Sequence, residues 1–266
     1  MTPAPASRDT GSRTIVLIPA RLASTRLPGK PLAIIEGEPM IVRVWRVALA
    51  SGLGRVVVAA AEPAIAEAVE RAGGEAVLVP DEVPSGTDRI QRALARLDPE
   101  RRYRRVVNLQ GDLPTLDPAD LARVVEPLDR LGVDIGTLAV ATTDPEERAR
   151  PNFVKAVVSF LCEDPTLGRA LYFTRAPAPT GEGPVWHHIG IYAFGRDALE
   201  RFCALPASPL ELREKLEQLR ALEAGMSIGV KLIAGAPFGV DTPEDLERAR
   251  AVLAARRTAR AEEGNP

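Results

Sequence analysis

The sequence predicts an α/β fold built on a doubly wound, mostly parallel sheet. Through the first half of the 266 residues, short apolar and β-branched runs alternate with segments of helical periodicity. Strands that are apolar along their whole length are typical of a parallel sheet covered by helices on both faces. The composition, 45% hydrophobic and 26% charged residues, is that of an ordinary globular protein. Together these observations favour a doubly wound core.

The first-half elements follow in a regular order. Strands are predicted over 14–19, 55–61, 76–80, 104–110 and 134–140. Helices are predicted over 40–51, 63–72, 87–97 and 118–131. Thr87 is placed to cap the third of these helices.

The regular alternation of strands and helices ends after Asp144. Strands are predicted over 153–160, 170–175, 187–195 and 227–233, and long helices over 209–224 and 243–261. No linker or repeat separates the halves, so we expect one domain over 14–261 with an added subregion. Residues 1–13 lack apolar periodicity and are predicted to form a disordered tail.

Charge and cysteine content narrow the function classes. The net charge of −2 argues against a nucleic-acid binder, which usually carries a basic excess. Cys162 and Cys203 form no metal-type pair, so a structural zinc site or disulfide framework is not expected. No apolar run approaches the length of a membrane span, and no signal peptide is evident. We therefore expect a cytoplasmic protein with neither nucleic-acid nor membrane partners.

A basic loop follows the first predicted strand. It runs from Ile18 to Leu32 and carries Arg21, Arg26 and Lys30 among small residues and prolines. Ligands of doubly wound sheets bind outside the carboxyl ends of the strands, where these cations would lie. A solvated loop with neighbouring cations is the ordinary alternative. The position favours phosphate binding, although the loop matches neither glycine-rich nucleotide motif.

Two aspartates are candidate metal ligands. Asp112 follows Gly111 after the strand at 104–110, and Asp241 precedes a helix start signal at 242–245. A turn former and a helix N-cap are the ordinary interpretations of the two residues. Mg²⁺, however, takes carboxylates together with substrate phosphates. On the residues alone an N-cap is the favoured interpretation of Asp241, and a magnesium site shared with phosphate is the alternative.

These motifs resemble those of the sugar-activating nucleotidyltransferases of the nucleotide-diphospho-sugar transferase fold. The loop, "QGD" at 110–112 and "GVDTPEDL" at 239–246 are most similar to those of the 3-deoxy-manno-octulosonate cytidylyltransferase family, and ordered motifs extend from about Ile15 to Leu253. The resemblance implies catalytic roles for Arg21, Lys30, Asp112 and Asp241. It also implies that the two aspartates hold Mg²⁺ as cofactor, either one ion or two ions that share them. The implied contacts to CTP are Arg21, Ser24, Arg26, Lys30, Ser85, Gly86, Arg89 and Gln110, the last four from "SGTDR" and "QGD".

Sugar contacts are implied in the second half. Arg175 matches the arginine of the family's "YFSRA", and His188 and Tyr192 match its "RHLGIYGY". Glu214 and Gln218 match the family's "SPLE…EQLR" element. The helix predicted over 209–224 places these two on a polar stripe with Glu211, opposite Leu212, Leu216 and Leu219. A solvated surface is the ordinary alternative. His188 is equally expected as a packed residue, and adjacent histidines on one strand make a shared metal site improbable.

The sequence departs from the family pattern on the acceptor side. Leu113 replaces the glutamate of "QGDEP", His187 replaces an arginine, and the loop after Arg175 is short. Ala59–Ala61 also replaces "ATD".

The resemblance implies a homodimeric enzyme that joins CTP to 3-deoxy-manno-octulosonate (Kdo), giving CMP-Kdo and diphosphate for lipopolysaccharide biosynthesis. Two alternatives remain open: a cytidylyltransferase for 8-amino-Kdo or another ulosonic acid, and a non-catalytic nucleotide-sugar binding module.

Overall fold

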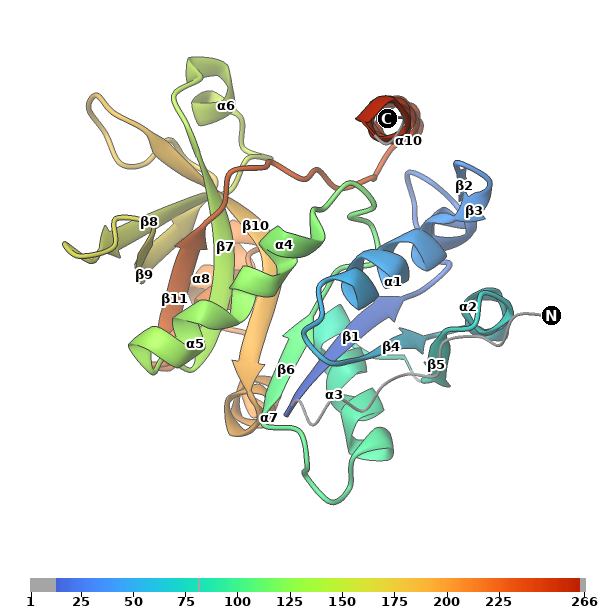
Figure 1. Cartoon of the computed structure of the whole chain (residues 1–266). Helices are drawn as coiled ribbons and strands as arrows, with labels where there is room; N and C mark the ends of the chain where they lie inside the picture. The colour runs from blue at the N-terminus through green and yellow to red at the C-terminus, as the bar shows by residue number, and fades with distance from the viewer. Residues whose placement is uncertain (1–12, 81, 264–266) are drawn as a thin grey trace. The chain divides into compact units, whose positions relative to one another are not determined.

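The structure is a computed structural model that describes residues 13–80 and 82–263 (Figure 1). The predicted tail, 1–13, lies outside the described residues except for Arg13. The chain divides into two compact units. The first comprises Met1–Pro99, Leu109–Pro118 and Pro237–Pro266, and the second comprises Glu100–Asn108 and Ala119–Ala236. The boundaries of a single domain over 14–261 stay a prediction.

The first unit contains a parallel sheet in the order β5-β4-β1. These strands are β1 (Thr14–Ala20), β4 (Arg55–Ala60) and β5 (Glu75–Leu78). Ile15 pairs with Arg55, and the fully buried Val57 and Val58 lie at the centre of β4. Because almost every residue of β1 and β4 is buried, the sheet needs cover on both faces, as the apolar runs predict.

Helices provide this cover. Figure 1 shows α1 (Met40–Ala50) on the near side of the first unit's sheet and α3 (Gly86–Leu97) on its far side. The remaining elements are α2 (Pro63–Arg71), α10 (Pro243–Glu263), the short helix η1 (Lys30–Leu32) and the hairpin of β2 (Ile34–Ile35) and β3 (Glu38–Pro39). β1 ends at Ala20, and the cations of the basic loop follow it directly, beginning with Arg21.

The second unit contains a mixed sheet in the order β6-β10-β7-β11-β9-β8. Its strands are β6 (Arg105–Asn108), β7 (Ile135–Thr142), β8 (Lys155–Phe160), β9 (Leu167–Thr174), β10 (Val185–Gly195) and β11 (Ile228–Leu232). β7 and β11 are parallel, whereas β10 runs antiparallel to β6, β7 and β8. The added subregion expected after Asp144 therefore supplies the antiparallel strands.

Helices of the second unit are shorter than the sequence predicts. They are α4 (Pro118–Ala122), η2 (Arg123–Val125), α5 (Glu126–Leu131), α6 (Pro145–Ala149), α7 (Arg196–Ala204), α8 (Pro209–Glu214) and α9 (Gln218–Glu223). The segment 118–131 tightens to a 3₁₀ turn just before Pro127, where the Glu126 N–H donates to the Arg123 carbonyl. Proline has no N–H to continue the α-helical ladder. No helix in the described part of the chain has the length and apolarity that a membrane span requires.

The predicted helix over 209–224 is wrong as a continuous element. Lys215 adopts the left-handed conformation, with φ of 55°, and separates α8 from α9. The Arg175 guanidinium donates to the Glu214 and Lys215 carbonyls, at 2.8 and 3.3 Å. These bonds satisfy carbonyl groups at the C-terminal end of α8. The predicted faces change with this break: Leu212 is 66% exposed, whereas Gln218 is only 4% exposed.

Thr87 is not the cap of α3. Ser85 occupies the N-cap, and its hydroxyl accepts from the Asp88 N–H at 3.2 Å. The helix therefore begins at Gly86, one residue earlier than predicted, and Thr87 is buried in its first turn.

Candidate functional site

A cavity of about 370 Å³ lies in the first unit, where β1 ends. Its lining comes from the basic loop, the start of α3, the segment after β6 and Asp241, two residues before α10. Every residue predicted for the nucleotide and the metal lines it: Arg21, Ser24, Arg26, Lys30, Ser85, Gly86, Arg89, Gln110, Asp112 and Asp241. Thr25, Pro31 and Val83 also line the cavity. Pro31 and Val83 have no polar side-chain group, so only their position could have indicated them, whereas Thr25 offers a hydroxyl next to Ser24.

The basic loop is folded back on itself by its own hydrogen bonds. The Ser24 hydroxyl accepts from the Leu27 N–H at 3.3 Å, and the Gly29 N–H donates to the Leu22 carbonyl at 3.3 Å. Gly29 has a φ of 69°, a conformation that costs glycine little. The chain then enters η1, whose first residue, Lys30, extends its side chain into the cavity.

The start of α3 forms another wall. Besides capping the helix, Ser85 donates from its hydroxyl to Asp88 Oδ2 at 2.8 Å. Gly86 packs closely on β1, since an added Cβ would lie 3.1 Å from Pro19 Cγ. Arg89 is 6% exposed and donates to the Val79 carbonyl at the end of β5. Its guanidinium is therefore tied to the scaffold as well as lining the cavity.

The two aspartates come from segments far apart in the sequence. A Cβ on Gly111 would lie 3.1 Å from the Pro19 carbonyl oxygen, so glycine allows this segment to approach β1. The Val240 N–H donates to the Asp112 carbonyl at 2.9 Å. This bond ties the residue before Asp241 to Asp112.

Asp241 does not cap α10. Thr242 Oγ1 accepts from the Asp245 N–H at 3.2 Å, while Asp245 Oδ2 accepts from the Thr242 N–H at 3.0 Å. This reciprocal pair has the pattern of a capping box. Asp245 Oδ2 also accepts from the Asp241 N–H, which leaves the Asp241 carboxylate to face the cavity.

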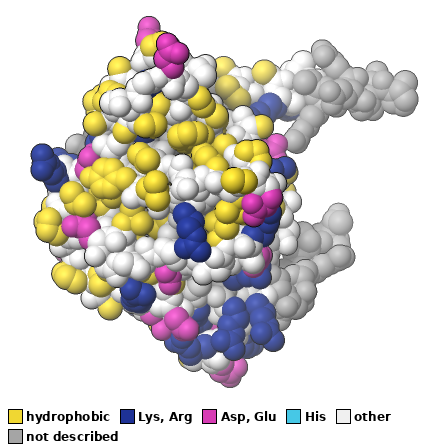
Figure 2. Space-filling model, turned by 90° about the vertical axis from the view of Figure 1, so that its left-hand side faces the viewer, with side chains coloured by type: hydrophobic (Ala, Val, Ile, Leu, Met, Phe, Trp, Pro, Cys, Tyr) yellow, Lys and Arg dark blue, Asp and Glu magenta, His cyan; other side chains and the backbone are white. Residues whose placement is uncertain are grey.

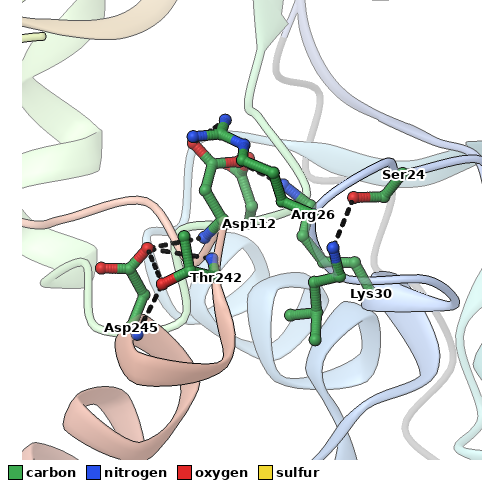
Figure 3. Close-up of polar contacts among 8 residues, drawn as sticks. Ser24, Arg26, Lys30, Asp112, Thr242 and Asp245 are labelled. Carbon is green, nitrogen blue, oxygen red and sulfur yellow. Dashed lines mark hydrogen bonds and ion pairs between the residues drawn. The ribbon is translucent and has the colours of Figure 1, made fainter.

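Lys30 and Arg26 of the basic loop form ion pairs with the two aspartates. Lys30 Nζ lies 2.7 Å from Asp112 Oδ2 and 3.0 Å from Asp241 Oδ1. Arg26 Nη2 lies 3.0 Å from Asp241 Oδ2. Figure 3 labels Arg26, Lys30 and Asp112 together with Thr242 and Asp245 at the start of α10. Burial lowers the pKa of Lys30, but the carboxylates of Asp112 and Asp241 more than offset this, so the pKa is raised. Lys30 is accordingly cationic at neutral pH.

The donor set fits Mg²⁺ held jointly with a ligand. Asp112 and Asp241 both direct an oxygen at one cationic atom, the Lys30 nitrogen. Within the described residues no group of three or more His, Cys, Asp or Glu side chains is arranged to hold a metal ion. Two carboxylates match an ion that completes its shell with phosphate oxygens and water.

The residues predicted for the sugar all lie in the second unit. Glu214, at the end of α8, accepts from Thr174 Oγ1 at 2.9 Å and from the Arg175 N–H at 3.0 Å. The Arg175 guanidinium also donates to the Pro151 carbonyl at 3.1 Å, besides those of Glu214 and Lys215. Arg175 and Glu214 thus hold β9 against the end of α8.

Tyr192 and Gln218 form a buried polar pair. The Tyr192 hydroxyl donates to Gln218 Oε1 at 3.1 Å, and Gln218 Nε2 has no hydrogen-bond partner among the described residues. Burial, followed by the charge of Glu217, raises the pKa of Tyr192. Its hydroxyl is therefore a hydrogen-bond donor and not a base.

The histidines of β10 face different partners. His188 is 7% exposed, with Nε2 3.0 Å from Thr137 Oγ1, and its ring packs edge-on to Phe173. The His187 ring stacks on Phe153 with centroids 3.5 Å apart. Burial, with a smaller contribution from His187, lowers the pKa of His188 to about 3. Burial and the charge of Lys155 lower the pKa of His187 to about 4. Both imidazoles are neutral at neutral pH.

Comparison with known proteins identifies the family. The family model described as cytidylyltransferase matches residues 15–228. The 3-deoxy-manno-octulosonate cytidylyltransferase of Parvibaculum lavamentivorans is 61% identical over 252 residues, covering 95% of this chain and 97% of the relative. The protein of the same name from Methylobacterium sp. strain 4-46 is 62% identical over 246 residues, covering 92% of this chain and 99% of the relative.

Solved structures agree with these relatives. CMP:2-keto-3-deoxy-manno-octonic acid synthetase complexed with CTP superposes with a TM-score of 0.84 at 37% identity, covering 92% of this chain and 100% of that one. A cytidylyltransferase from Leptospira borgpetersenii, with a TM-score of 0.59 and 18% identity over 92% of this chain and 87% of that one, shares the fold. The predicted α/β fold class is confirmed. The chain belongs to the cytidylyltransferase family, among the 3-deoxy-manno-octulosonate cytidylyltransferases.

Proposed function

We propose that this chain transfers the cytidylyl group of CTP to Kdo, forming CMP-Kdo and diphosphate for lipopolysaccharide biosynthesis. One observation carries the proposal: the basic loop and both aspartates line a single cavity. Relatives that cover nearly the whole chain carry the name of this activity, and a solved relative at 37% identity is complexed with CTP.

The cavity residues would act by positioning and charge neutralisation. Arg21 and Arg26 offer forked donors to phosphate oxygens, and Lys30 offers a point charge on a flexible stem. The anomeric hydroxyl oxygen of Kdo attacks the α-phosphorus, and the bond from that phosphorus to the bridging oxygen breaks. Diphosphate leaves with the bonding electrons, and the hydroxyl proton passes to water. The loop cations stabilise the negative charge that develops on the departing diphosphate.

Asp112 and Asp241 would hold Mg²⁺ as cofactor. When bound with the triphosphate, the ion would supply positive charge that offsets the negative charge of the phosphate oxygens during the attack. Support comes from the convergence of both carboxylates on the Lys30 nitrogen.

The second unit would bind the sugar acid. Gln218 Nε2 is buried without a partner in the described part of the chain, while Oε1 of the same side chain accepts from Tyr192. A hydrogen bond to a sugar hydroxyl would satisfy Nε2. We assign His188, Arg175 and Glu214 to the same subsite through their match to the family motifs. In the structure all three also hold neighbouring elements, so each would position the subsite as well as contact the sugar.

The second unit would also form a homodimer. Leu171 on β9 is 62% exposed and Leu212 on α8 is 66% exposed. Figure 2, viewed from the side on which β8 and β9 lie in Figure 1, shows hydrophobic side chains gathered over much of that face. Apolar surface of this kind is typical of an interface between proteins.

The enzyme would work in the cytoplasm. Cys162 is exposed and its thiol is free. Free exposed thiols persist in a reducing compartment. Recovery of the native enzyme in the cytoplasmic fraction of the source cells is the expected result.

Diphosphate release from CTP tests the proposed reaction. Purified protein with Mg²⁺, CTP and Kdo should release one diphosphate per CMP-Kdo formed, and omission of Kdo should abolish release. Competition between Kdo and 8-amino-Kdo in the same assay tests the acceptor. A tenfold preference for 8-amino-Kdo would overturn Kdo as the substrate. CTP binding without diphosphate release from any ulosonic acid would identify a non-catalytic binding module instead.

A further inference from the structure

The Lys30 ammonium lies where the two aspartate carboxylates converge. Its nitrogen is 2.7 Å from Asp112 and 3.0 Å from Asp241, distances of direct charge-assisted hydrogen bonds. The Lys30 side chain is 16% exposed and that of Asp112 is 27% exposed, so solvent screens the Lys30–Asp112 pair only partly. The same carboxylates are the only acids that line the cavity in the described residues.

The charges of this cluster are balanced. Two carboxylates, Asp112 and Asp241, face two cations, Lys30 and Arg26. A divalent ion added to this arrangement would meet both cations at close range. A triphosphate is itself negatively charged, so its oxygens can form ion pairs with the loop cations. The carboxylates then lose their cationic partners and can bind a metal ion. The affinity of the two carboxylates for a divalent ion should therefore be higher when a polyphosphate is bound.

Lys30 is built to exchange partners without a change in the backbone. Its N–H donates to the Leu27 carbonyl at 3.1 Å, and its carbonyl accepts from the Ala33 N–H at 3.1 Å. These bonds hold the main chain, while the four-carbon side chain can rotate. The ammonium can thus move from the carboxylates to a phosphate that enters the same cavity.

We propose that Lys30 is a tethered counter-cation for Asp112 and Asp241, which a divalent ion replaces only when a polyphosphate draws the ammonium away. The proposal rests on the assignment of the cavity to CTP and Mg²⁺. It adds that Lys30 suppresses metal binding by the protein alone and makes the metal and the nucleotide bind cooperatively. Because such coupling is reciprocal, each ligand raises the affinity for the other by the same factor.

Metal binding without nucleotide tests this role. The probe is Mn²⁺, which shares the oxygen ligands of Mg²⁺ and whose free concentration is read by electron paramagnetic resonance. Removing one close positive charge from a partly buried site is expected to raise metal affinity tenfold or more. Lys30→Met should therefore bind Mn²⁺ at least tenfold more tightly than the wild type. Lys30→Arg, which keeps the charge, should bind like the wild type.

Further variants show where the ion binds. Lys215→Met removes a positive charge from an exposed residue of the second unit and should leave Mn²⁺ affinity unchanged. Lys30→Met/Asp112→Asn should lose the affinity gained by Lys30→Met. Circular dichroism and thermal unfolding confirm that each variant is folded.

Three results would overturn the counter-cation role. The first is equal Mn²⁺ affinity of folded Lys30→Met and wild type, and the second is a gain that survives Asp112→Asn. The third needs no variant: stoichiometric uptake of Mn²⁺ by the wild type at tens of micromolar, without nucleotide. Diphosphate release is measured separately on the wild type, so active enzyme with any of these results rejects the counter-cation and leaves the proposed function intact.

Discussion

At the residue scale, the site depends on where the carboxylates and cations stand relative to one another. Asp112 and Asp241 are separated widely in the sequence, yet both approach one lysine nitrogen within 3.0 Å. The side chain of Asp241 is not needed to cap α10, since Asp245 and Thr242 do so. Both carboxylates instead face the cations of the cavity.

Neutralising either aspartate should lower turnover by more than tenfold. Asp112→Asn and Asp241→Asn each remove a negative charge from the expected metal shell while keeping the side-chain shape. Steady-state diphosphate release measures the loss. Asp129→Asn, which changes an exposed surface aspartate of the second unit, should turn over like the wild type. Full activity in both cavity variants would reject the metal assignment.

Gly111→Ala should disturb Asp112 through the backbone. The added Cβ would lie 3.1 Å from the Pro19 carbonyl oxygen and 3.2 Å from Ile41 Cδ1. We expect a loss of about 1–2 kcal/mol in the free energy of unfolding, as for other overpacked sites. Chemical denaturation measures this loss. Gly239→Ala is the matched control, because its Cβ would meet nothing within 4 Å. Equal stability of the two variants would contradict the close packing.

At the element scale, strands were more predictable than helix ends. The buried strands β1 and β4 follow from apolar runs alone, because a run apolar throughout is stable only when both faces are covered. The break at Lys215 could not be predicted, since it is stabilised by Arg175 from β9, far away in the sequence. Tertiary contacts of this kind leave no local pattern.

The candidate site divides in the same way. The cavity residues were predictable because they follow strand ends and carry charged groups in recognisable motifs. The burial of Gln218 and the exposure of Leu212 could not be predicted, because both depend on the helix break at Lys215. Helices α6 and α7 were missed because strong strand patterns precede them and their own amphipathic patterns are short.

Ser85→Ala should remove the cap of α3. Its hydroxyl satisfies the Asp88 N–H, and loss of such a cap typically costs about 1 kcal/mol of stability. Chemical denaturation of the variant measures this cost. Ser159→Ala, at an exposed strand position, should change stability by no more than about 0.5 kcal/mol. A Ser85→Ala protein as stable as the control would show that the cap contributes nothing.

At the scale of the whole molecule, stability should fall in mild acid. The pKa of His188 is lowered from 6.5 to about 3, so the unfolded chain takes up a proton below about pH 6.5 that the folded protein does not. This stability is complete above pH 6.5 and is lost as the pH falls towards 3. One such histidine contributes a slope of about 1 kcal/mol per pH unit. His188→Phe should show a correspondingly shallower slope in denaturation between about pH 6 and pH 4. Equal slopes would contradict the burial of a neutral imidazole.

The association state should depend on the apolar face of the second unit. Wild-type protein at micromolar concentration should scatter light as a dimer, and Leu171→Asp should scatter as a monomer, because the charge would be buried at the interface. Leu49→Asp alters an exposed leucine of α1 in the first unit and should remain dimeric. A monomeric wild type would reject the homodimer.

The most direct measurement of the central claim is calorimetric titration of the wild-type protein with CTP in the presence of Mg²⁺. The account predicts one nucleotide per chain, with affinity lowered at least tenfold by Lys30→Met or by Asp112→Asn. Absence of heat and of saturable uptake, or affinity unaltered by both substitutions, would contradict the assignment of this cavity to the nucleotide.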